Sequence, residues 1–314
     1  MFNDYSTVFG KPLSPVFNNV LNVVFGPNIR GIRGAYLQTG DRDVPVIGGV
    51  PRFVSSDQYA SSFTFQWERF SQTQLDSSQG VNLTLQDLVA KTQVDPESLR
   101  GKVVLDVGVG IGRHAEYFCK AGAFVIGIDL SESVVQAHSN LFKYPNAVVL
   151  QADLFDLPFQ HGVFDLVYSI GVLHHTPSWR DALRAISVFP KLASGLFSIW
   201  LYGANFSRRD EWVRFTNQIE PEMFLNLCRL LVAAHRGAPS GFAMKNELME
   251  VVLRHFPFSV HHPNFERSLL ALFDGYSPAF HAVTTSLEIA SEMSSLGYLS
   301  RSGVVEASAA GRRA

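Results

Sequence analysis

Short, almost wholly apolar runs of residues alternate with segments of helical spacing through the middle of the chain. The apolar runs are rich in β-branched residues and occupy 103–107, 124–129, 147–153, 164–170 and 195–202. This pattern predicts strands that are buried on both faces of a parallel sheet, with helices as the crossovers. We therefore expect an α/β fold with a doubly wound, mostly parallel sheet.

Three glycines separate the first apolar run from the helical segment that follows it. Gly108, Gly110 and Gly112 let the backbone turn sharply, and they let a ligand approach main-chain N–H groups at a helix N-terminus. The spacing predicts a nucleotide-type binding loop. Glycine spacing alone is weak evidence, and the third glycine comes one residue too early for the dinucleotide fingerprint.

Acidic and hydroxyl side chains stand at the ends of several predicted strands. Asp129 ends the second strand about twenty residues after the first glycine, where a ribose diol needs an acceptor. Asp106 lies inside the first strand, where a carboxylate is costly unless it holds the loop amides or a ligand. Because the carboxyl ends of parallel strands share one edge, Gly108, Asp129, Asp153 and Ser169 should converge on one crevice.

These motifs resemble those of the class I S-adenosylmethionine-dependent methyltransferases. The resemblance rests on residues 105–112, 127–131 and 164–177 and on Asp153, and it fades outside residues 95–205. It implies a seven-stranded, Rossmann-like sheet with S-adenosyl-L-methionine as the cofactor. It also implies methyl transfer to an oxygen, nitrogen or carbon of a small-molecule acceptor, such as a metabolite, a sugar or a lipid-linked compound.

The resemblance further implies roles for single residues. Backbone amides around Gly108 and Gly110 would face the methionine carboxylate and the ribose, and Asp129 would accept hydrogen bonds from both ribose hydroxyls. Asp153 would accept the adenine amine, with Leu154 as an apolar neighbour. The expected cofactor-binding residues are Asp106, Gly108, Gly110, Gly112, Asp129, Leu130, Asp153, Leu154, Ser169, Ile170 and Trp67.

Two adjacent histidines, His174 and His175, follow the fourth predicted strand. Neighbouring residues on a turn point in different directions, so they are poorly arranged to chelate one ion, and we expect no metal site. We expect His174 to face the methyl donor and to act as a base; the alternative is a turn that only shapes the pocket. Arg113 would either stabilise the loop or pair with a carboxylate. Asp165 should satisfy backbone donors at a strand start.

Four regions are predicted along the chain. Residues 1–82 form an N-terminal extension of short strands and loops with a cofactor-covering segment, and residues 83–203 form the cofactor-binding core. Residues 204–270 form a helical insertion that acts as a substrate lid, and residues 271–314 complete the core. Within residues 273–281, Tyr276 and His281 are secondary site candidates, with ordinary loop packing as the alternative.

Aromatic residues recur at helical spacing within residues 59–70. They predict a helix whose aromatic face packs in the core or, as the resemblance suggests, covers the cofactor through Gln66, Trp67 and Gln74.

The sequence around this segment makes further structural predictions. Residues 20–25 and 43–50 read as strands. Residues 48–54 resemble the end of a β-rich, sometimes zinc-binding module, but the cysteines of a zinc site are absent there. Residues 83–97 predict one helix, and Ser131 predicts the N-cap of the next helix after the second strand. The short Ala/Ser/Arg-rich tail predicts an abbreviated or frayed closing hairpin.

Composition restricts the partners. The net charge of −2 and a pI near 6.5 give no electrostatic footprint for nucleic acid. Cys119 and Cys228 are too few for a disulfide framework, and no signal peptide or run of about eighteen apolar residues is present. We expect a cytoplasmic protein that is not inserted in a membrane and acts on a small molecule; a homo-oligomer is permitted.

Two other classes of function remain open at this stage. A nicotinamide-dependent oxidoreductase is favoured only by the glycine loop and Asp129. A non-catalytic cofactor-binding protein is compatible with the intact loop and its acids.

Overall fold

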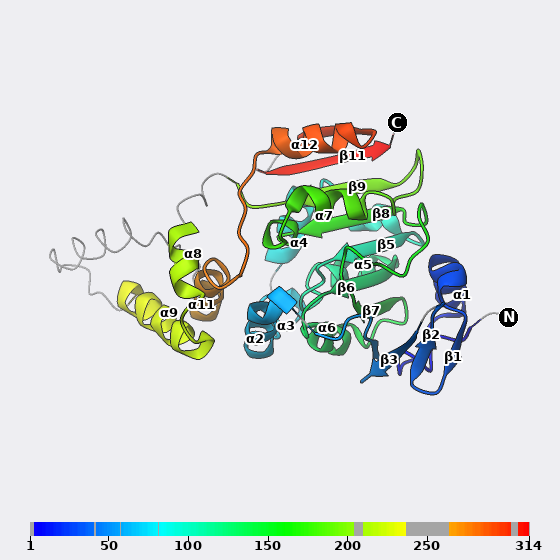
Figure 1. Cartoon of the computed structure of the whole chain (residues 1–314), viewed down its shortest axis with the longest axis horizontal. Helices are drawn as coiled ribbons and strands as arrows, with labels where there is room; N and C mark the ends of the chain where they lie inside the picture. Colours follow the sequence, from blue (N-terminus) through cyan, green and yellow to red (C-terminus); the bar gives the residue numbers. More distant parts are fainter. Residues whose placement is uncertain are drawn as a thin grey trace.

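A seven-stranded sheet forms the centre of the computed structural model, with the strand order β10-β11-β9-β8-β5-β6-β7 (Figure 1). The structure describes residues 3–40, 42–56, 58–80, 82–203, 210–236, 264–302 and 307–313. The strands are β5 Val103–Val107, β6 Phe124–Asp129, β7 Ala147–Gln151, β8 Leu166–Ile170, β9 Leu196–Trp200, β10 Tyr298–Ser302 and β11 Ser308–Arg313. Strands β5 to β9 are parallel, and β11 pairs antiparallel with both of its neighbours.

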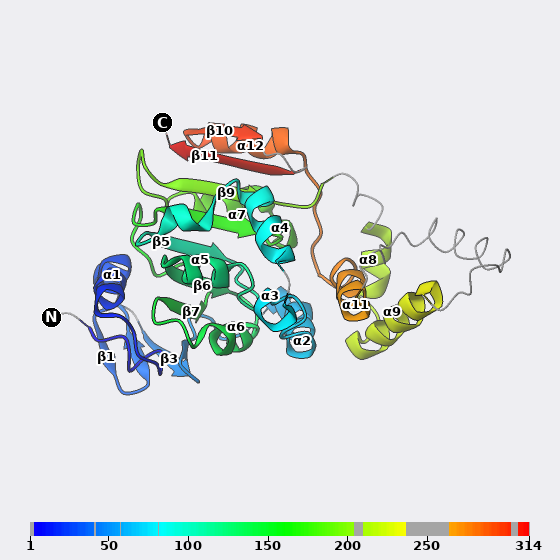
Figure 2. The ribbon, with the colours of Figure 1, turned by 180° about the vertical axis from the view of Figure 1, so that it is seen from behind.

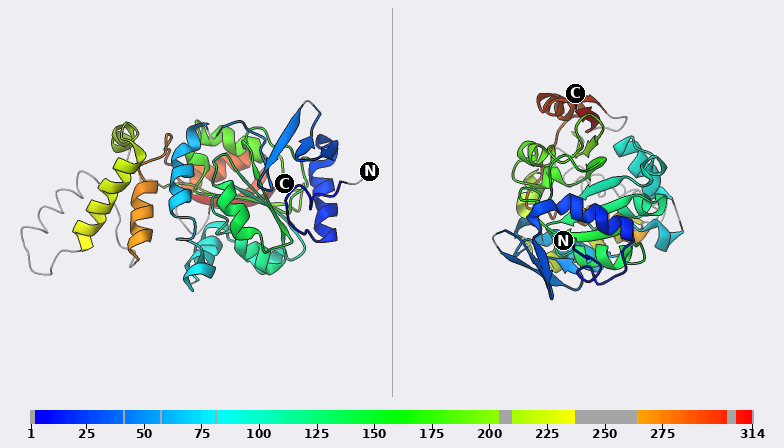
Figure 3. Two further views of the ribbon diagram at one scale, coloured as in Figure 1. Left: turned by 90° about the horizontal axis from the view of Figure 1, so that it is seen from below. Right: turned by 90° about the vertical axis from the view of Figure 1, so that its right-hand side faces the viewer.

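The chain winds outward from β5 in two directions, because β5 pairs with both β6 and β8. Helices cover both faces of the sheet, as the view from below shows (Figure 3). Alternate residues of each strand serve the two faces: Val104 lies in the core under α4 Leu83–Thr92, α5 Ala115–Ala121 and α6 Val134–Leu141, and Leu105 lies in the core under α7 Trp179–Ile186 and α12 Ser286–Ser295. The predicted doubly wound α/β fold is confirmed.

The N-terminal extension consists of helix α1 Pro15–Phe25 and a small antiparallel sheet of β1 Gly31–Arg33, β2 Tyr36–Gln38, β3 Asp43–Ile47 and β4 Val50–Pro51. The prediction of a strand at residues 20–25 was wrong. Ser14 caps the helix by accepting from the Phe17 amide, and Pro15 fixes its first turn. Phe17 and Leu21 are buried on the same side of this helix, so its apolar period is helical despite the valines.

This extension is attached to the edge of the central sheet. The Phe53 amide donates to the Gln151 carbonyl on β7 over 2.8 Å, and the ring of Phe17 stacks on Phe124. Arg52 is buried and contacts Gln151 Oε1 at 2.7 Å and Glu132 at 2.6 Å. The outer edge of β7 is thereby covered.

Two helix boundaries differ from the sequence prediction. Helix α4 ends at Thr92 rather than near residue 97, because Gln93 adopts a left-handed conformation (φ 58°). A separate short turn, η3 Pro96–Leu99, follows it. Ser131 is not an N-cap: its hydroxyl is bonded to Asp129 and Ser133, and α6 begins only at Val134.

Within the described residues, β10 and β11 pair along their length, so the prediction of an abbreviated or frayed hairpin was wrong. Five residue pairs join β10 to β11, and five join β11 to β9 (Figure 2). Strand β11 lies between two partners, where space is short: a Cβ on Gly311 would stand 2.7 Å from the Leu299 carbonyl oxygen. A glycine at position 311 therefore fits the close approach of the β10 backbone.

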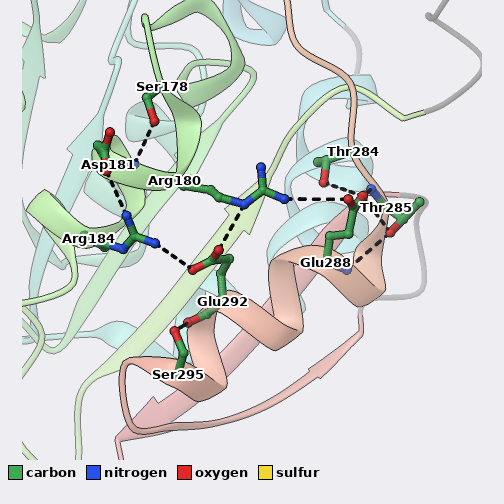
Figure 4. A network of polar contacts seen from close by, with 9 residues as sticks. All are labelled: Ser178, Arg180, Asp181, Arg184, Thr284, Thr285, Glu288, Glu292 and Ser295. Atoms are coloured by element: carbon green, nitrogen blue, oxygen red, sulfur yellow. Dashed lines mark hydrogen bonds and ion pairs between the residues drawn. The ribbon is translucent and has the colours of Figure 1, made fainter.

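Helices α7 and α12 are joined by a surface network of charged side chains (Figure 4). Arg180 Nε donates to Glu292 over 3.0 Å, and Arg184 contacts the other Glu292 oxygen at 3.4 Å. Thr285 and Glu288 form a capping box at the start of α12. Both arginines are about half exposed, so the network aligns the helices more than it stabilises the fold.

The insertion is helical where the structure describes it, with α8 Asp210–Thr216, α9 Pro221–Arg236 and α11 Phe265–Asp274 standing to one side of the sheet (Figure 1). The remainder of the predicted insertion, residues 204–209 and 237–263, lies outside the described residues. The described helices share an apolar cluster with Phe70, which follows α2 Ser61–Arg69. Within the described ranges, no helix has both the length and the apolarity to cross a membrane.

Candidate active site

A cavity of about 810 Å³ opens beyond the carboxyl ends of β5, β6 and β8. This is the point where the chain reverses its winding direction, and open α/β sheets bind their ligands there. The volume lies in the upper part of the range of about 300–1,000 Å³ that is usual for small-molecule sites. The cavity can therefore hold a nucleotide-sized cofactor and a small second ligand.

Most of the predicted cofactor-binding residues line this cavity. The lining includes Gly108, Gly110, Asp129, Leu130, Asp153, Leu154, Ile170 and Trp67. Three predicted residues do not line it, namely Asp106, Gly112 and Ser169. They lie behind the wall and support it.

The glycine loop is held by the acid at the end of β6. The Gly110 amide donates to Asp129 Oδ2 over 2.9 Å, while Asp129 Oδ1 accepts from the amide and the hydroxyl of Ser131 at 2.9 and 2.7 Å. A carboxylate offers about four acceptor positions, so these three bonds leave room for one further donor. Burial raises the pKa of Asp129, and the bonds from Ser131 and Gly110 oppose that shift.

Gly108 can only be glycine in this arrangement. Its φ is +83°, and a Cβ added there would stand 2.1 Å from Cγ2 of Val172 on the loop after β8. This close approach packs the loop after β5 against the loop after β8. At Gly108 the cavity wall is therefore formed by backbone rather than by a side chain.

The three residues behind the wall have other partners. Asp106 is buried and accepts a hydrogen bond from the Tyr168 hydroxyl, and burial raises its pKa to about 7. The Ser169 hydroxyl donates to the Val107 carbonyl over 3.0 Å, and Gly112 packs against Leu141. The structure thus gives these residues a role in fixing the loop and the sheet rather than in lining the cavity.

Helix α2 closes one side of the cavity. Gln66, Trp67 and Gln74 all line it, and the Trp67 indole lies 3.5 Å from the position that a Cβ on Gly110 would take. Gln66 is fully buried and donates to Asp274 Oδ1 on α11 over 3.0 Å. The same helix also packs on α11 through Phe65, whose ring lies on Phe273, so its aromatic face contributes to packing as well as to the cavity wall.

The far end of the cavity is aromatic. Trp200 and Tyr202 at the end of β9 line it together with Tyr276. The Tyr202 hydroxyl donates to Asp274 Oδ2 over 2.8 Å, so this carboxylate joins α11 to the sheet. The sequence analysis named Tyr276 but missed Trp200, Tyr202 and Asp274.

Among the described residues, the cavity also carries three cations, of which only Arg113 was predicted as a candidate from the sequence. Lys91 on α4 pairs with Asp87 at 2.9 Å and lies 3.8 Å from the centre of the Trp200 ring. Arg267 on α11 donates to the Thr73 carbonyl over 3.1 Å, and Arg113 lines the wall near the glycine loop. Of the predicted lid, only α11 contributes lining residues among the described parts of the insertion.

The two histidines of the turn after β8 have different positions. His174 is fully buried, does not line the cavity, and packs its ring 3.9 Å from that of Tyr202 and 4.0 Å from that of His175. Burial holds the pKa of His174 well below its usual range. His175 lines the cavity. His175, and not His174, therefore lines the cavity wall, although the two rings are in contact.

Among the described residues, no group of three or more His, Cys, Asp or Glu side chains is placed to hold a metal ion.

The site that the fold and the cavity define is that of a nucleotide-cofactor enzyme of the doubly wound class.

Comparison with known proteins narrows this class. Residues 105–188 match the model of the methyltransferase domain family. This part of the chain is a class I S-adenosylmethionine-dependent methyltransferase domain, and S-adenosylmethionine is the cofactor of that class.

Individual relatives match over the same core. A tRNA U34 carboxymethyltransferase from Geobacter sp. (strain M21) is 38% identical over 91 residues, which are 28% of this chain and 28% of the relative. A ubiquinone biosynthesis O-methyltransferase from Chromobacterium violaceum is 36% identical over 106 residues, which are 32% of this chain and 44% of the relative. The match thus spans less than half the length of either relative.

Among solved structures, phosphoethanolamine N-methyltransferase 2 from Haemonchus contortus, in complex with S-adenosyl-L-methionine, is 26% identical. The superposition covers 39% of this chain and 28% of that chain, with a TM-score of 0.35.

Proposed function

We propose that this protein binds S-adenosylmethionine in the cavity and transfers its methyl group to a small-molecule acceptor. The observation that carries the proposal is the pairing of Asp129 with the Gly110 amide at one end of a cavity whose other end is aromatic. One end thus offers carboxylate acceptors for a nucleoside, and the other offers aromatic side chains for a second molecule.

The residues present fit the cofactor. Asp129 would bind the ribose, and Leu130 and Leu154 would flank the adenine, with Asp153 as an acceptor for its amine. The Gly108 and Gly110 amides already donate to the Ile128 carbonyl and to Asp129, so these glycines would serve the methionine part by letting it approach bare backbone closely. Asp129 keeps one acceptor position in the structure, so it binds both ribose hydroxyls only if the Gly110 amide releases it.

When bound, S-adenosylmethionine supplies a methyl group that is already activated by its positive sulfur. The protein therefore has to position the acceptor and keep water away. Trp67 and Gln66 on α2 and Asp274 on α11 close over the cavity in the structure. We propose that α2 covers the cofactor and that α11, as part of the lid, encloses the acceptor.

The character of the far end favours a small acceptor with an apolar or aromatic body. Trp200, Tyr202 and Tyr276 provide the walls, and the enclosed volume leaves limited space beside the cofactor. The net charge of −2 also disfavours a polyanion. One relative is named for tRNA and another for ubiquinone biosynthesis, so nucleic acid is the acceptor class to be tested against the small molecule. We further propose a cytoplasmic location, with which the buried free cysteines agree.

Calorimetry tests the cofactor assignment first. S-adenosylmethionine and S-adenosylhomocysteine should bind with micromolar affinity, and NAD should not bind. Substitution of Trp67 by Ala should weaken binding of S-adenosylhomocysteine by about tenfold through lost apolar contact, whereas Phe215→Ala on exposed α8 should not. Binding of NAD alone would support an oxidoreductase and refute the proposal.

Turnover then tests the activity. Formation of S-adenosylhomocysteine would be measured with phenol, aniline, thiophenol and bulk tRNA as acceptors. Methylation of a small acceptor supports the proposal. Methylation of tRNA alone would show that the acceptor is a nucleic acid rather than a small molecule. Cofactor binding without turnover of any acceptor would favour a non-catalytic cofactor-binding protein.

A further inference from the structure

The His175 ring is held in one tautomer by the backbone. Its Nδ1 lies 2.9 Å from the Phe280 carbonyl oxygen. A carbonyl oxygen can only accept a hydrogen bond, so Nδ1 carries the hydrogen. In a neutral imidazole, Nε2 then carries the lone pair and can accept a proton.

This Nε2 is buried and accepts no hydrogen bond within the described structure, although His175 lines the cavity. A buried acceptor without a partner is costly, and native proteins keep few of them. A ligand that donates a hydrogen to Nε2 would satisfy it. A hydroxyl group is the acceptor that gains most from such a base, because its oxygen must lose a proton to become a good nucleophile.

Aromatic rings pack around the His175 imidazole. The Phe63 ring centre lies 5.1 Å from that of His175, and the Tyr202 ring centre lies 5.3 Å away. His174 and His281 are the other imidazoles nearby, with ring centres 4.0 and 6.2 Å away.

One carboxylate faces this group. Asp274 on α11 is fixed by Gln66 and by the Tyr202 hydroxyl, and its charge favours the protonated form of His175. Burial outweighs that effect and lowers the pKa of His175 to about 4. The ring is therefore neutral near pH 7, and Asp274 and the Phe280 carbonyl stabilise the imidazolium when a proton arrives.

We propose that His175 Nε2 is the base that removes the proton from a hydroxyl acceptor, which makes this protein an O-methyltransferase. This inference rests on the proposed function. The O–H bond breaks and its proton joins the lone pair of Nε2, while an oxygen electron pair forms the bond to the methyl carbon. The carbon–sulfur bond breaks with its electron pair remaining on sulfur, which gives S-adenosylhomocysteine, and the imidazolium then loses its proton to solvent.

His174 lacks the features that single out its neighbour. Both of its ring nitrogens are without hydrogen-bond partners, so nothing selects its tautomer, and its ring lies behind the cavity wall. The two histidines are thus separable by substitution.

The first test is spectroscopic and needs no acceptor. In protein labelled with ¹⁵N-histidine and loaded with S-adenosylhomocysteine, ¹⁵N–¹H correlation at neutral pH should show His175 protonated on Nδ1 and not on Nε2. The His175→Asn variant assigns the signal, because it removes that signal. A hydrogen found on Nε2 would overturn the inference whatever the protein methylates.

The second test is kinetic. His175→Asn retains an amide N–H near the position of Nδ1, so it can keep the bond to Phe280 and loses only the base. We expect it to lower kcat/KM for phenol by about 100-fold or more at pH 7.5, while affinity for S-adenosylhomocysteine is unchanged. Its rate should rise about tenfold per pH unit, because solution ionisation of phenol replaces the base. Thiophenol, which is largely ionised near neutral pH, should be methylated at nearly the wild-type rate.

The control is His138→Asn, because His138 is an imidazole whose pKa burial also lowers to about 4 and which does not line the cavity. It should retain wild-type rates with phenol. His175→Gln repeats the test if the Asn variant fails to bind S-adenosylhomocysteine.

The outcomes separate the two proposals. Turnover of phenol that survives in the His175 variants, or a loss confined to His174→Asn, would overturn this inference and leave the proposed function intact. Absence of turnover by the wild-type protein with every acceptor would overturn the proposed function and this inference with it.

Discussion

The amide of Gly110 donates a hydrogen bond of 2.9 Å to the carboxylate of Asp129, which joins the loop after β5 to the end of β6. The two strands are neighbours in the sheet, so the bond closes a short bridge across their carboxyl ends. Because Asp129 also accepts from Ser131, this one carboxylate organises two loops of the cavity.

Substitution of Asp129 by Ala should therefore weaken binding of S-adenosylhomocysteine. The change removes the proposed ribose acceptor and the partner of the Gly110 amide together. Hydrogen bonds to charged groups contribute about 1.5–3 kcal/mol, so we expect the dissociation constant to rise roughly 10- to 100-fold. Calorimetry measures it, with exposed Asp181→Ala on α7 as the control. A change of less than threefold would exclude Asp129 from the binding site.

Gly108→Ala should lower the unfolding free energy by more than the backbone strain of its positive φ alone would. The new Cβ would meet Val172 at 2.1 Å, whereas Gly162 has a φ of +67° and no atom within 4 Å of its Cβ position. Gly162→Ala should cost about 1 kcal/mol of unfolding free energy from backbone strain, and Gly108→Ala about 2–4 kcal/mol. Urea denaturation compares them. The double variant Gly108→Ala, Val172→Ala should recover part of the difference; equal costs for the two glycines would contradict the packing argument.

The raised pKa of Asp106 predicts a pH dependence of stability. Burial raises this pKa to about 7 from an ordinary value of 3.8, so between these pH values the folded protein keeps a proton that the unfolded chain has lost. The folded state then binds more protons, and the unfolding free energy falls as the pH rises. The contribution of Asp106 should decrease by roughly 2–4 kcal/mol between pH 4.5 and 7.5.

Asp106→Asn removes this dependence, because the amide stays neutral and can still bond to Tyr168. The difference in unfolding free energy between variant and wild type should move in favour of the variant as the pH rises over that range. Asp181→Asn, an exposed carboxylate, should show no such trend. Parallel pH profiles of the Asp106→Asn variant and the wild type would contradict the assignment.

Much of the core domain could be predicted from the sequence, because the residues of each strand and helix indicate that element by themselves. The strands were visible as apolar runs, and the rule that parallel strands end at one edge was enough to bring Gly108, Asp129 and Asp153 together from the sequence alone. The same local logic held for Asp165, which accepts from the Val103 amide at a strand start and pairs with Lys191. The helix over residues 61–69 was visible from its aromatic spacing.

The residues that were missed depend on contacts between distant parts of the chain. Arg267 lies in the predicted lid and Asp274 just beyond it, both on α11, and nothing in the spacing of their neighbours singles out these two side chains. The valines of residues 20–25 favour a strand by propensity. These residues nevertheless form part of helix α1, because the helix buries one apolar face against the sheet. The choice between His174 and His175 depends on the direction of one turn, which the sequence does not specify.

The last prediction concerns the contact of Arg52 with Gln151. Through Gln151, this contact links the N-terminal extension to the cavity wall at Leu130. Arg52 is buried and bonds to Gln151 Oε1 at 2.7 Å, and Gln151 Nε2 donates to the carbonyl of Leu130, a cavity residue, over 3.0 Å. Arg52→Met keeps the apolar stem and removes the donor, which leaves buried polar groups of Gln151 without their partner. We expect a loss of about 3 kcal/mol in unfolding free energy and a rise of about three- to tenfold in the dissociation constant of S-adenosylhomocysteine. Arg100→Met, which breaks an exposed pair with Glu97, should cost less than about 1 kcal/mol and leave affinity unchanged. If Arg52→Met loses stability but binds S-adenosylhomocysteine as the wild type does, the extension only covers the sheet edge, and Leu130 is held in place by the core domain alone.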